Sequence, residues 1–394
     1  MTITRREILT ALLGLPAAGW ACRRDAASRP AWDGEDVDDG RGWGHALRDR
    51  REPPLGRVDA PTKVDVLILG GGMAGLSAAW RLVRQGVTDV AVLEAHDAIG
   101  GTSRGGRSRV TGYPWGAHYV PVPGPGQPHL RALLREMDVL VETDTGFAPG
   151  EAARITEPVE RSFFRGQWHA GLFPFSSSAS QGERARFFRA VDAWVRFRDA
   201  DGRRAFALPF GTSSDDPRVA ALDEMTFAEW LDREGFDDPG VRWAVRYASR
   251  DDYGTEPEQL SAWFGLAYFA ARAEAHATES APFIAWPDGN ARIAAHLGQA
   301  VGRGRLHTGQ VAASVRPRGG EGRCRAVSLD AAGAARTWSA RSVVFALPSY
   351  VRPYLLPEPL HGTYRPDYAP WIVSNVHLSG RPEYRGFETA WNNV

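Results

Sequence analysis

The clearest hydrophobic pattern in the chain predicts a strand, a helix and a second strand in close succession. An apolar run at 64–69 leads into the glycine-rich segment 70–75, and apolar positions with helical spacing follow from 76 to 85. A second apolar run, 90–93, ends at Glu94. Because a helix that joins two parallel strands forms a βαβ unit, this order predicts the start of a parallel sheet.

The turn between the first strand and the helix has the spacing G-x-G-x-x-G, in which each glycine has its own role. Gly70 permits the tight turn, Gly72 lets the backbone approach a pyrophosphate, and Gly75 lets the helix pack closely on the strand. The helix N-terminus presents free N–H groups and a partial positive charge to phosphates. Glu94 lies where a carboxylate accepts hydrogen bonds from the ribose hydroxyls of adenosine. The segment therefore predicts an adenine dinucleotide site, and a βαβ unit that binds nothing is the alternative.

A pair of glycines after the acid helps to decide which dinucleotide is bound. Gly100 and Gly101 follow Glu94 after a short loop. In this context the chain resembles the flavin amine oxidase and phytoene desaturase superfamily, in which a Gly-Gly-Arg or Gly-Gly-Thr element lies beside the pyrophosphate and the ribityl chain. Thr102 stands where the amine oxidases have arginine, so Arg104 is the candidate for that charge. A flexible turn is the alternative reading of the glycine pair.

Residues 113–120 resemble the Gly-Ala-aromatic segment of the same superfamily, which runs past the isoalloxazine ring. Gly116 and Ala117 occupy the small-residue positions, and His118 follows them. An imidazole changes charge near neutral pH, so His118 is the candidate catalytic residue, as a proton carrier or a flavin contact. A structural, hydrogen-bonded histidine is the alternative.

Two later segments continue the resemblance. Residues 286–297 look like the Pro-x-Gly turn and helix that lead back into the flavin domain, and 341–348 match the strand that ends in Ala-x-Pro. Between them, 305–311 predict a strand and a turn. In amine oxidases a valine at this point contacts the adenine through its backbone, and Val311 is the matching residue.

The resemblance implies an α/β fold: a Rossmann-like FAD-binding domain around a central parallel sheet, with an inserted α+β substrate domain. It also implies FAD as the cofactor. The residues expected to contact FAD are Gly70, Gly72, Met73, Ala74, Gly75, Glu94, Gly100, Gly101, Thr102, Arg104, Gly116, Ala117 and Val311.

The predicted organisation divides the chain into six segments. These are a twin-arginine-type signal segment at 1–22, a linker at 23–61 with Trp43 and Leu47 as candidate anchors, the first part of the FAD-binding domain at 62–149, the inserted substrate domain at 150–284, the second part of the FAD-binding domain at 285–350, and the start of further substrate-domain strands at 351–394. Residues 372–378 predict one such strand. Superfamily members add more strands and a final flavin-facing segment, so we expect the protein to continue past Val394 and this chain alone to retain FAD weakly.

Shorter patterns predict individual elements inside the insertion. Residues 161–168 read as a hairpin, and 181–199 have the alternation of an amphipathic helix. Thr226 and Glu229 form a capping box at the start of another helix. Residues 260–269 predict an aromatic-rich helix, which we interpret as core in preference to the lining of an apolar cavity.

Composition excludes some classes of function. With 394 residues the chain is long enough for two domains, and its formal net charge of zero gives no electrostatic case for a nucleic-acid partner. The two cysteines, Cys22 and Cys324, provide neither a disulfide framework nor a Cys/His cluster at metal-binding spacing.

The N-terminal segment has the features of an export signal. Arg5 and Arg6 precede a short apolar core at 8–18, which fits the twin-arginine pattern and is too short to span a bilayer comfortably. A chance arginine pair is the alternative. Cys22 closes the segment, and lipidation there would anchor the protein to the membrane. Without lipidation the protein would be periplasmic or secreted.

The leading functional prediction is an FAD-dependent oxidoreductase of amine oxidase type that takes a hydride from a C–N or C–C bond of a small organic substrate. Flavin chemistry needs few catalytic side chains, so the lack of a catalytic triad in the sequence is expected. The electron acceptor, oxygen or a quinone, stays open. The alternatives are a carotenoid-type desaturase, a non-catalytic exported protein and an NAD-dependent dehydrogenase; the Gly100-Gly101 pair speaks against the last.

Overall fold

A computed structural model shows how the chain folds. It describes residues 34, 44–45, 60–124, 126–143, 146–155, 160–164, 166–170, 178–271, 283–317, 322–360, 362, 366–380 and 391–393. The chain divides into two compact units, 1–50 and 51–394, and every element below belongs to the second unit. The predicted signal segment, Cys22 and the linker residues Trp43 and Leu47 lie outside the described residues.

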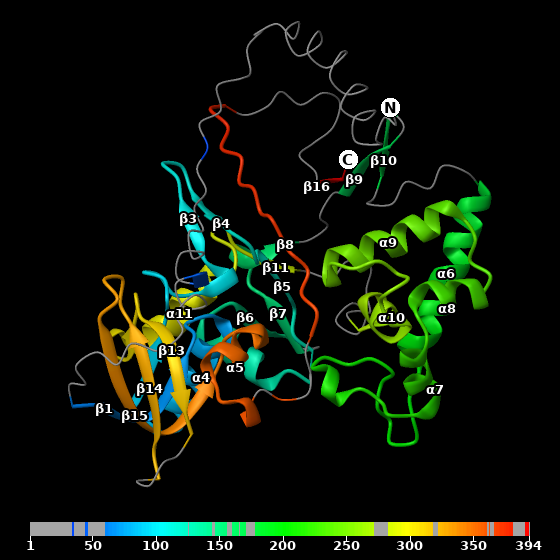
Figure 1. Ribbon diagram of the computed structural model, residues 1–394. Coiled ribbons are helices and arrows are strands. Elements are labelled where there is room, and N and C mark those ends of the chain that lie inside the picture. The colour runs from blue at the N-terminus through cyan, green and yellow to red at the C-terminus, as the bar shows by residue number, and fades with distance from the viewer. Residues whose placement is uncertain are drawn as a thin grey trace, which may run out of the picture. The chain divides into compact units, whose positions relative to one another are not determined.

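A six-stranded mixed sheet forms the centre of the nucleotide-binding part (Figure 1). Its strands, in spatial order, are β12 (Leu306–His307), β2 (Val90–Leu93), β1 (Thr62–Leu69), β15 (Ala335–Phe345), β14 (Cys324–Leu329) and β13 (Val311–Arg316). β1 runs parallel to both β2 and β15, whereas β14 is antiparallel to its two neighbours. The βαβ unit predicted from the first apolar runs is therefore present, in a Rossmann-like α/β fold.

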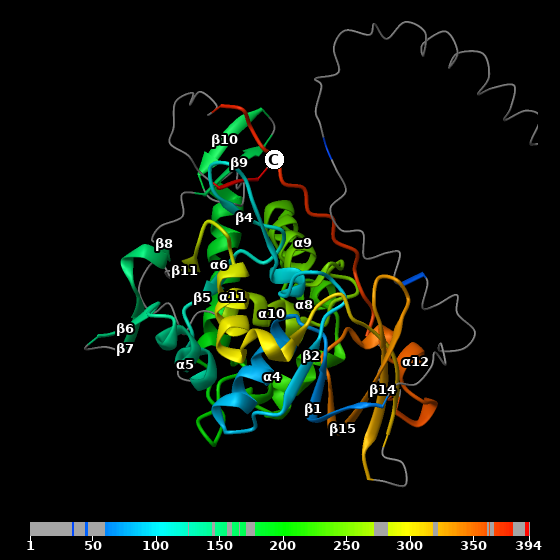
Figure 2. The same ribbon diagram turned by 90° about the vertical axis from the view of Figure 1, so that its left-hand side faces the viewer.

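Two helices cover one face of this sheet. α4 (Met73–Arg84) and α11 (Ala291–Val301) lie side by side (Figure 2) and share a buried apolar cluster with β1 and β2. Leu76 and Leu297 are fully buried there with Ile68. On the other face, Trp338 of β15 packs with Leu67 and is also fully buried. Both faces of the second half of β1 are thus covered, which explains why residues 66–69 are all apolar.

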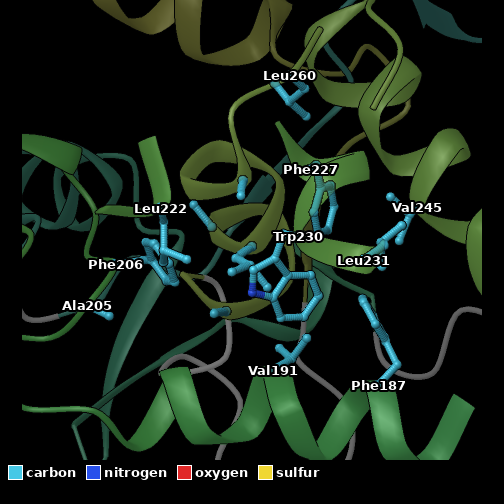
Figure 3. Packing of buried hydrophobic residues seen from close by; sticks show 14 of the residues in the cluster. Phe187, Val191, Ala205, Phe206, Leu222, Phe227, Trp230, Leu231, Val245 and Leu260 are labelled. Atoms are coloured by element: carbon cyan, nitrogen blue, oxygen red, sulfur yellow. The ribbon is translucent and has the colours of Figure 1, made fainter. Parts of the chain in front are cut away.

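Helices dominate the described part of the insertion. They are α6 (Ser178–Arg196), α7 (Pro217–Ala220), α8 (Phe227–Arg233), α9 (Pro239–Tyr253) and α10 (Ala262–Ala270). They share an aromatic core, in which the Trp230 ring contacts Phe187 edge-on and Phe227 at a tilted angle (Figure 3). The predicted aromatic helix is α10. Its buried face joins this core, and Gly265 lets the Phe227 ring approach, because a Cβ there would lie 2.1 Å from the ring.

The described chain also contains several smaller elements. They are β3 (Gly105–Arg107) paired with β4 (Gly112–Pro114); β5 (Tyr119–Pro121), β11 (Phe283–Ala285) and β8 (Arg154–Ile155) in one sheet; β6 (Leu140–Thr143) with β7 (Gly146–Pro149); β10 (Gln167–Ala170), β9 (Glu160–Phe164) and β16 (Trp391–Asn393) in another; and the helices α5 (Pro128–Glu136) and α12 (Arg352–Leu355). Within the described residues no helix is long and apolar enough to cross a membrane.

Local sequence signals fixed several of these elements correctly. β9 and β10 form the predicted antiparallel hairpin. The capping box is complete, because the Glu229 N–H donates to Thr226 Oγ1 at 3.1 Å and the Thr226 N–H donates to Glu229 Oε2 at 2.8 Å. The amphipathic pattern at 181–199 corresponds to α6, which starts three residues earlier.

The strand predicted at 372–378 is wrong. Residues 366–378 are extended but pair with no described strand (Figure 1). Ile372 is 93% exposed and Val376 75% exposed. Alternating apolar residues favour an extended backbone, but a strand exists only where a neighbour supplies the ladder of hydrogen bonds.

Candidate functional site

The turn that leads into α4 requires glycine at position 70 for two reasons. This residue has φ +103°, a conformation that side chains rarely adopt. A Cβ on Gly70 would also lie 2.7 Å from the Ala346 carbonyl oxygen at the end of β15. The Ala346 N–H in turn donates to the Leu69 carbonyl at 2.9 Å. Both the turn and the close approach of β15 therefore require glycine here, as the motif predicted.

Two further glycines are also required by packing. A Cβ on Gly75 would lie 1.9 Å from the Gly70 carbonyl oxygen, so only glycine lets α4 sit this close to β1. The motif leaves position 71 unspecified, but a Cβ on Gly71 would lie 2.9 Å from the Glu94 side chain and clash with it. The Gly71 N–H instead donates to Glu94 Oε2 at 2.8 Å. The run of three glycines was the available sequence signal for this contact.

The Glu94 carboxylate is 8% exposed and is held in one orientation by two backbone donors. Oε2 accepts from Gly71, and Oε1 accepts from the His96 N–H at 2.9 Å. A carboxylate oxygen has two lone pairs, so each oxygen keeps acceptor capacity after these contacts. Glu94 is therefore fixed in place and still able to accept from a pair of ribose hydroxyls.

Gly72 differs from its neighbours, because nothing in the described protein requires it. Its φ of −75° suits any residue, and a Cβ would meet only the Gly101 Cα at 3.9 Å. No side chain caps α4 at this position. Gly72 forms a β-bridge with Gly100, whose N–H donates to the Gly71 carbonyl at 2.8 Å. Two glycine segments thus face each other beside the start of α4, where Met73 is half-buried and Ala74 exposed.

The residues after Gly101 fold back onto the predicted ring-contacting segment. The Ala117 N–H donates to the Thr102 carbonyl oxygen at 3.2 Å. Thr102 itself is exposed. A Cβ on Gly116 would lie 2.5 Å from the same oxygen, so glycine is required there. Arg104 is half-buried, and its Nε donates to the Gly101 carbonyl at 3.2 Å. The structure therefore brings the two predicted segments together.

His118 is exposed, and its Nδ1 lies 3.3 Å from the Gly116 carbonyl oxygen. Its ring packs edge-on against Tyr119, with the centroids 4.9 Å apart. Asn290, absent from the predicted site, holds this segment from the start of α11. Its backbone N–H donates to Ala117 at 3.0 Å and its amide nitrogen to Tyr119 at 3.3 Å. The Pro-x-Gly turn just before Asn290 was the sequence signal for this support.

Val311 lies next to the acid segment, although the two are far apart in the chain. The Gln310 N–H donates to the Glu94 carbonyl at 2.8 Å, and the Gly309 N–H donates to the His96 carbonyl at 2.8 Å. Val311 itself is buried at the start of β13. The residue before the predicted adenine contact is therefore hydrogen-bonded to the predicted ribose acid.

A dinucleotide fits this arrangement. No side chain covers the backbone at Gly72 and Gly101, the first turn of α4 offers N–H donors, and Glu94 presents acceptors one strand away. Glycine at position 72 fits the role that the motif gives it, which is the close approach of a phosphate to the backbone. Fold and site together define a dinucleotide-binding protein of the flavoprotein kind.

Comparison with known proteins identifies the family. The family model for flavin containing amine oxidoreductase matches residues 73–380, so the chain belongs to that family, whose cofactor is FAD. The chain is 30% identical over 216 residues to the monoamine oxidase-type protein AofH of Mycobacterium tuberculosis, covering 54% of this chain and 42% of AofH. It is 40% identical over 211 residues to a flavin-containing amine oxidase of Oncorhynchus mykiss, covering 52% of this chain and 36% of that protein.

Solved structures agree on the fold. Putrescine oxidase with bound putrescine matches with a TM-score of 0.55 at 19% identity, over 75% of this chain and 60% of that chain. The matched regions make up less than half the length of the two sequence relatives. The comparisons therefore establish family, fold and cofactor class.

Proposed function

We propose that this protein is an FAD-dependent oxidoreductase that oxidises the C–N bond of a small amine by hydride transfer. The family supports the flavin and the reaction class. The single structural observation that carries cofactor binding is the open space around Gly72, whose glycine the protein's own packing does not require. A similar protein, putrescine oxidase, binds the small amine putrescine.

Different residues of the chain bind FAD and orient its ring. The Gly72 and Gly101 backbones and the first turn of α4 bind the pyrophosphate, and Glu94 accepts from the ribose. Bound FAD supplies the ring that accepts the hydride as the amine carbon is oxidised. The 116–119 segment, fixed by Asn290, positions and shields that ring.

His118 is proposed as the proton carrier for this reaction. An amine in water carries a proton that must leave before its carbon can give up a hydride, and an imidazole can take that proton near neutral pH. His118 is exposed on the segment that the family places along the flavin ring. Exposure lets the imidazole exchange the proton with solvent.

A small substrate is favoured over a carotenoid chain by a pocket next to this segment. The pocket has a volume of about 150 Å³ and lies between β5 and residues of the helical part. Its walls include Val120, Leu130 and Leu208, with Arg204 as a charged member. Pockets for drug-sized molecules are typically about 300–1,000 Å³, so this volume suits a molecule of few heavy atoms.

The reaction class is tested by adding primary amines to the FAD-loaded protein without oxygen. We expect the flavin absorption near ~450 nm to bleach with at least one amine, and not with the alcohol of the same carbon skeleton. His118→Gln should slow bleaching, because the variant lacks a side chain that can accept the amine proton. Oxidised flavin that persists with every amine would contradict the proposal.

Cofactor binding is tested with a matched pair of glycine variants. Gly72→Asp should abolish FAD binding, because it places a side chain and a negative charge against the pyrophosphate. Gly72→Ala should leave the apoprotein as stable as before, or stabilise it by about 0.4–1 kcal/mol, while it weakens FAD binding. Gly75→Ala, by contrast, should destabilise the apoprotein by about 1–3 kcal/mol through its clash with Gly70. FAD titrations and urea unfolding measure both quantities, and full FAD binding by Gly72→Asp would sink the assignment.

A further inference from the structure

A buried chain of hydrogen bonds runs from the inner face of the sheet to the edge that carries Glu94. The Trp338 indole N–H donates to Ser328 Oγ at 2.9 Å, and the Ser328 hydroxyl donates to Gln310 Oε1 at 2.7 Å. Trp338 and Ser328 are both 0% exposed. Neither contact belongs to the G-x-G-x-x-G motif or to the family resemblance.

The direction of this chain follows from the atoms that meet in the structure. An indole nitrogen can only donate, so the serine oxygen must accept from it. The glutamine atom that faces Ser328 in the structure is Oε1, which can only accept, so the Ser328 hydroxyl donates to it. The carboxamide of Gln310 is therefore held in one of its two flip states, with its NH₂ group turned away from Ser328.

That NH₂ group belongs to the residue that joins the two adenosine-binding elements. The Gln310 backbone N–H donates to the Glu94 carbonyl, and Val311 follows directly. Gln310 is half-buried, and within the described part of the chain the hydrogen bond from Ser328 is the only one its side chain makes. Within the described residues, the Gln310 NH₂ group is thus a donor without a protein acceptor, on a residue that is hydrogen-bonded to Glu94.

We propose that Gln310 is a cofactor-binding residue whose amide N–H groups donate to the adenosine half of FAD, and that Ser328 and Trp338 are positioning residues which hold that amide. Adenosine presents ring nitrogens and ribose oxygens as acceptors, which match an amide donor. The flavin half lies at the opposite end of the cofactor. This inference rests on FAD binding at the glycine cradle.

The inference is tested by measuring binding to the apoprotein by calorimetry, with FAD, ADP and FMN as separate probes. Gln310→Leu and Gln310→Glu, which both remove the NH₂ donor, should weaken FAD and ADP about three- to tenfold. FMN, which lacks the adenosine half, should bind them as it binds the wild type. Ser328→Ala should cause a smaller loss for ADP, because the amide is freed to flip. Gln299→Leu, at an exposed glutamine of α11, is the matched control and should change nothing.

The outcomes separate this inference from the proposed function. Failure of the wild type to bind either FAD or ADP would overturn both. Wild-type ADP affinity in both Gln310 variants would overturn this inference alone. The thermal midpoint of each apoprotein is measured alongside, so that a lowered midpoint with unchanged ADP affinity identifies Gln310 as a structural link only and also overturns the inference.

Discussion

At the scale of the residue, His307 makes the stability of the fold depend on pH. Its ring packs edge-on against the buried Trp338, with centroids 5.0 Å apart, and its backbone carbonyl accepts from the Glu94 N–H. Burial, and then the nearby charge of Arg336, lower the pKa of His307 below its ordinary value of 6.5. The folded state therefore resists protonation of this imidazole, whereas the unfolded chain accepts the proton freely.

The sign of the pH effect follows from this difference. Above the unfolded pKa both states are neutral and His307 has no effect on stability, but as the pH falls through about 6.5 the unfolded state gains protons first. The free energy of unfolding should therefore decrease between about pH 7 and about pH 5, by an amount that solvent screening keeps small at this half-buried site. His307→Gln should lose less stability over this range than the wild type in urea unfolding. The exposed His129, changed to Gln, is the control, and equal pH dependence in all three proteins would refute the assignment.

Sequence reasoning found the residues whose role depends on neighbours in the chain. Gly70 and Gly75 serve a local turn and a local helix contact, so a six-residue motif describes them. Gln310 and Asn290 were missed, because their partners, Ser328 and the 117–119 segment, are brought to them only by the folded sheet and the loop before α11. Placement of the predicted site residues is consistent with the motif, but their contact with FAD stays a prediction.

At the scale of the element, one carboxylate ties three helices together. Glu136, at the end of α5, accepts from Trp80 of α4 at 3.3 Å, forms an ion pair with Arg84 of α4 and lies 3.1 Å from His296 Nε2 of α11. Its side chain is about three-quarters buried, so several donors depend on a single acceptor group. α4 and α11 are the two helices that cover the cofactor face of the sheet.

Removal of this charge should weaken the packing of α4 and α11, the helices at the proposed cofactor site. Glu136→Gln keeps the shape but loses the charge opposite Arg84 and one of the two acceptor oxygens. We expect destabilisation by about 1–2 kcal/mol, a modest value because Arg84 is half-exposed and its ion pair is screened. Glu142→Gln, at an exposed position of β6, should have almost no effect. A stability of Glu136→Gln equal to that of the control, measured by urea unfolding, would show that the cluster is incidental.

Elements were predictable where the signal was local, and unpredictable where a partner decided the outcome. The capping box before α8 and the hairpin at β9 and β10 are complete within a few residues, and both are present. Residues 372–378 have the same kind of alternating pattern as a strand, yet no described strand lies alongside them. A pattern of side chains records which face could be buried, and not whether another segment arrives to bury it.

At the scale of the whole molecule, we propose export through a twin-arginine route. Such a route carries proteins that are already folded, which suits a chain that must acquire FAD first. Replacing Arg5 and Arg6 by lysine should trap a folded, cofactor-loaded precursor in the cytoplasm, as measured by fractionation of a tagged protein. The same protein with Arg23 and Arg24 replaced is the matched control. Unchanged recovery outside the cytoplasm for the Arg5 and Arg6 variant would mean that the pair is incidental.

The pairing of β1 with β15 has a consequence for the order of events during synthesis. Thr62 lies opposite Trp338, and the Ala346 carbonyl lies close to Gly70. The strand of this sheet that is synthesised first is therefore paired with the one that is synthesised last. While only the first strands have been synthesised, the edge of β1 that later pairs with β15 stays unpaired, and the glycine turn lacks its contact with Ala346. Contacts between residues so far apart in the sequence form slowly, and aggregation-prone intermediates are exposed until they form. We therefore expect FAD to bind only after β15 has been synthesised, and we expect a chaperone that covers β1 until then to raise the yield of FAD-loaded protein.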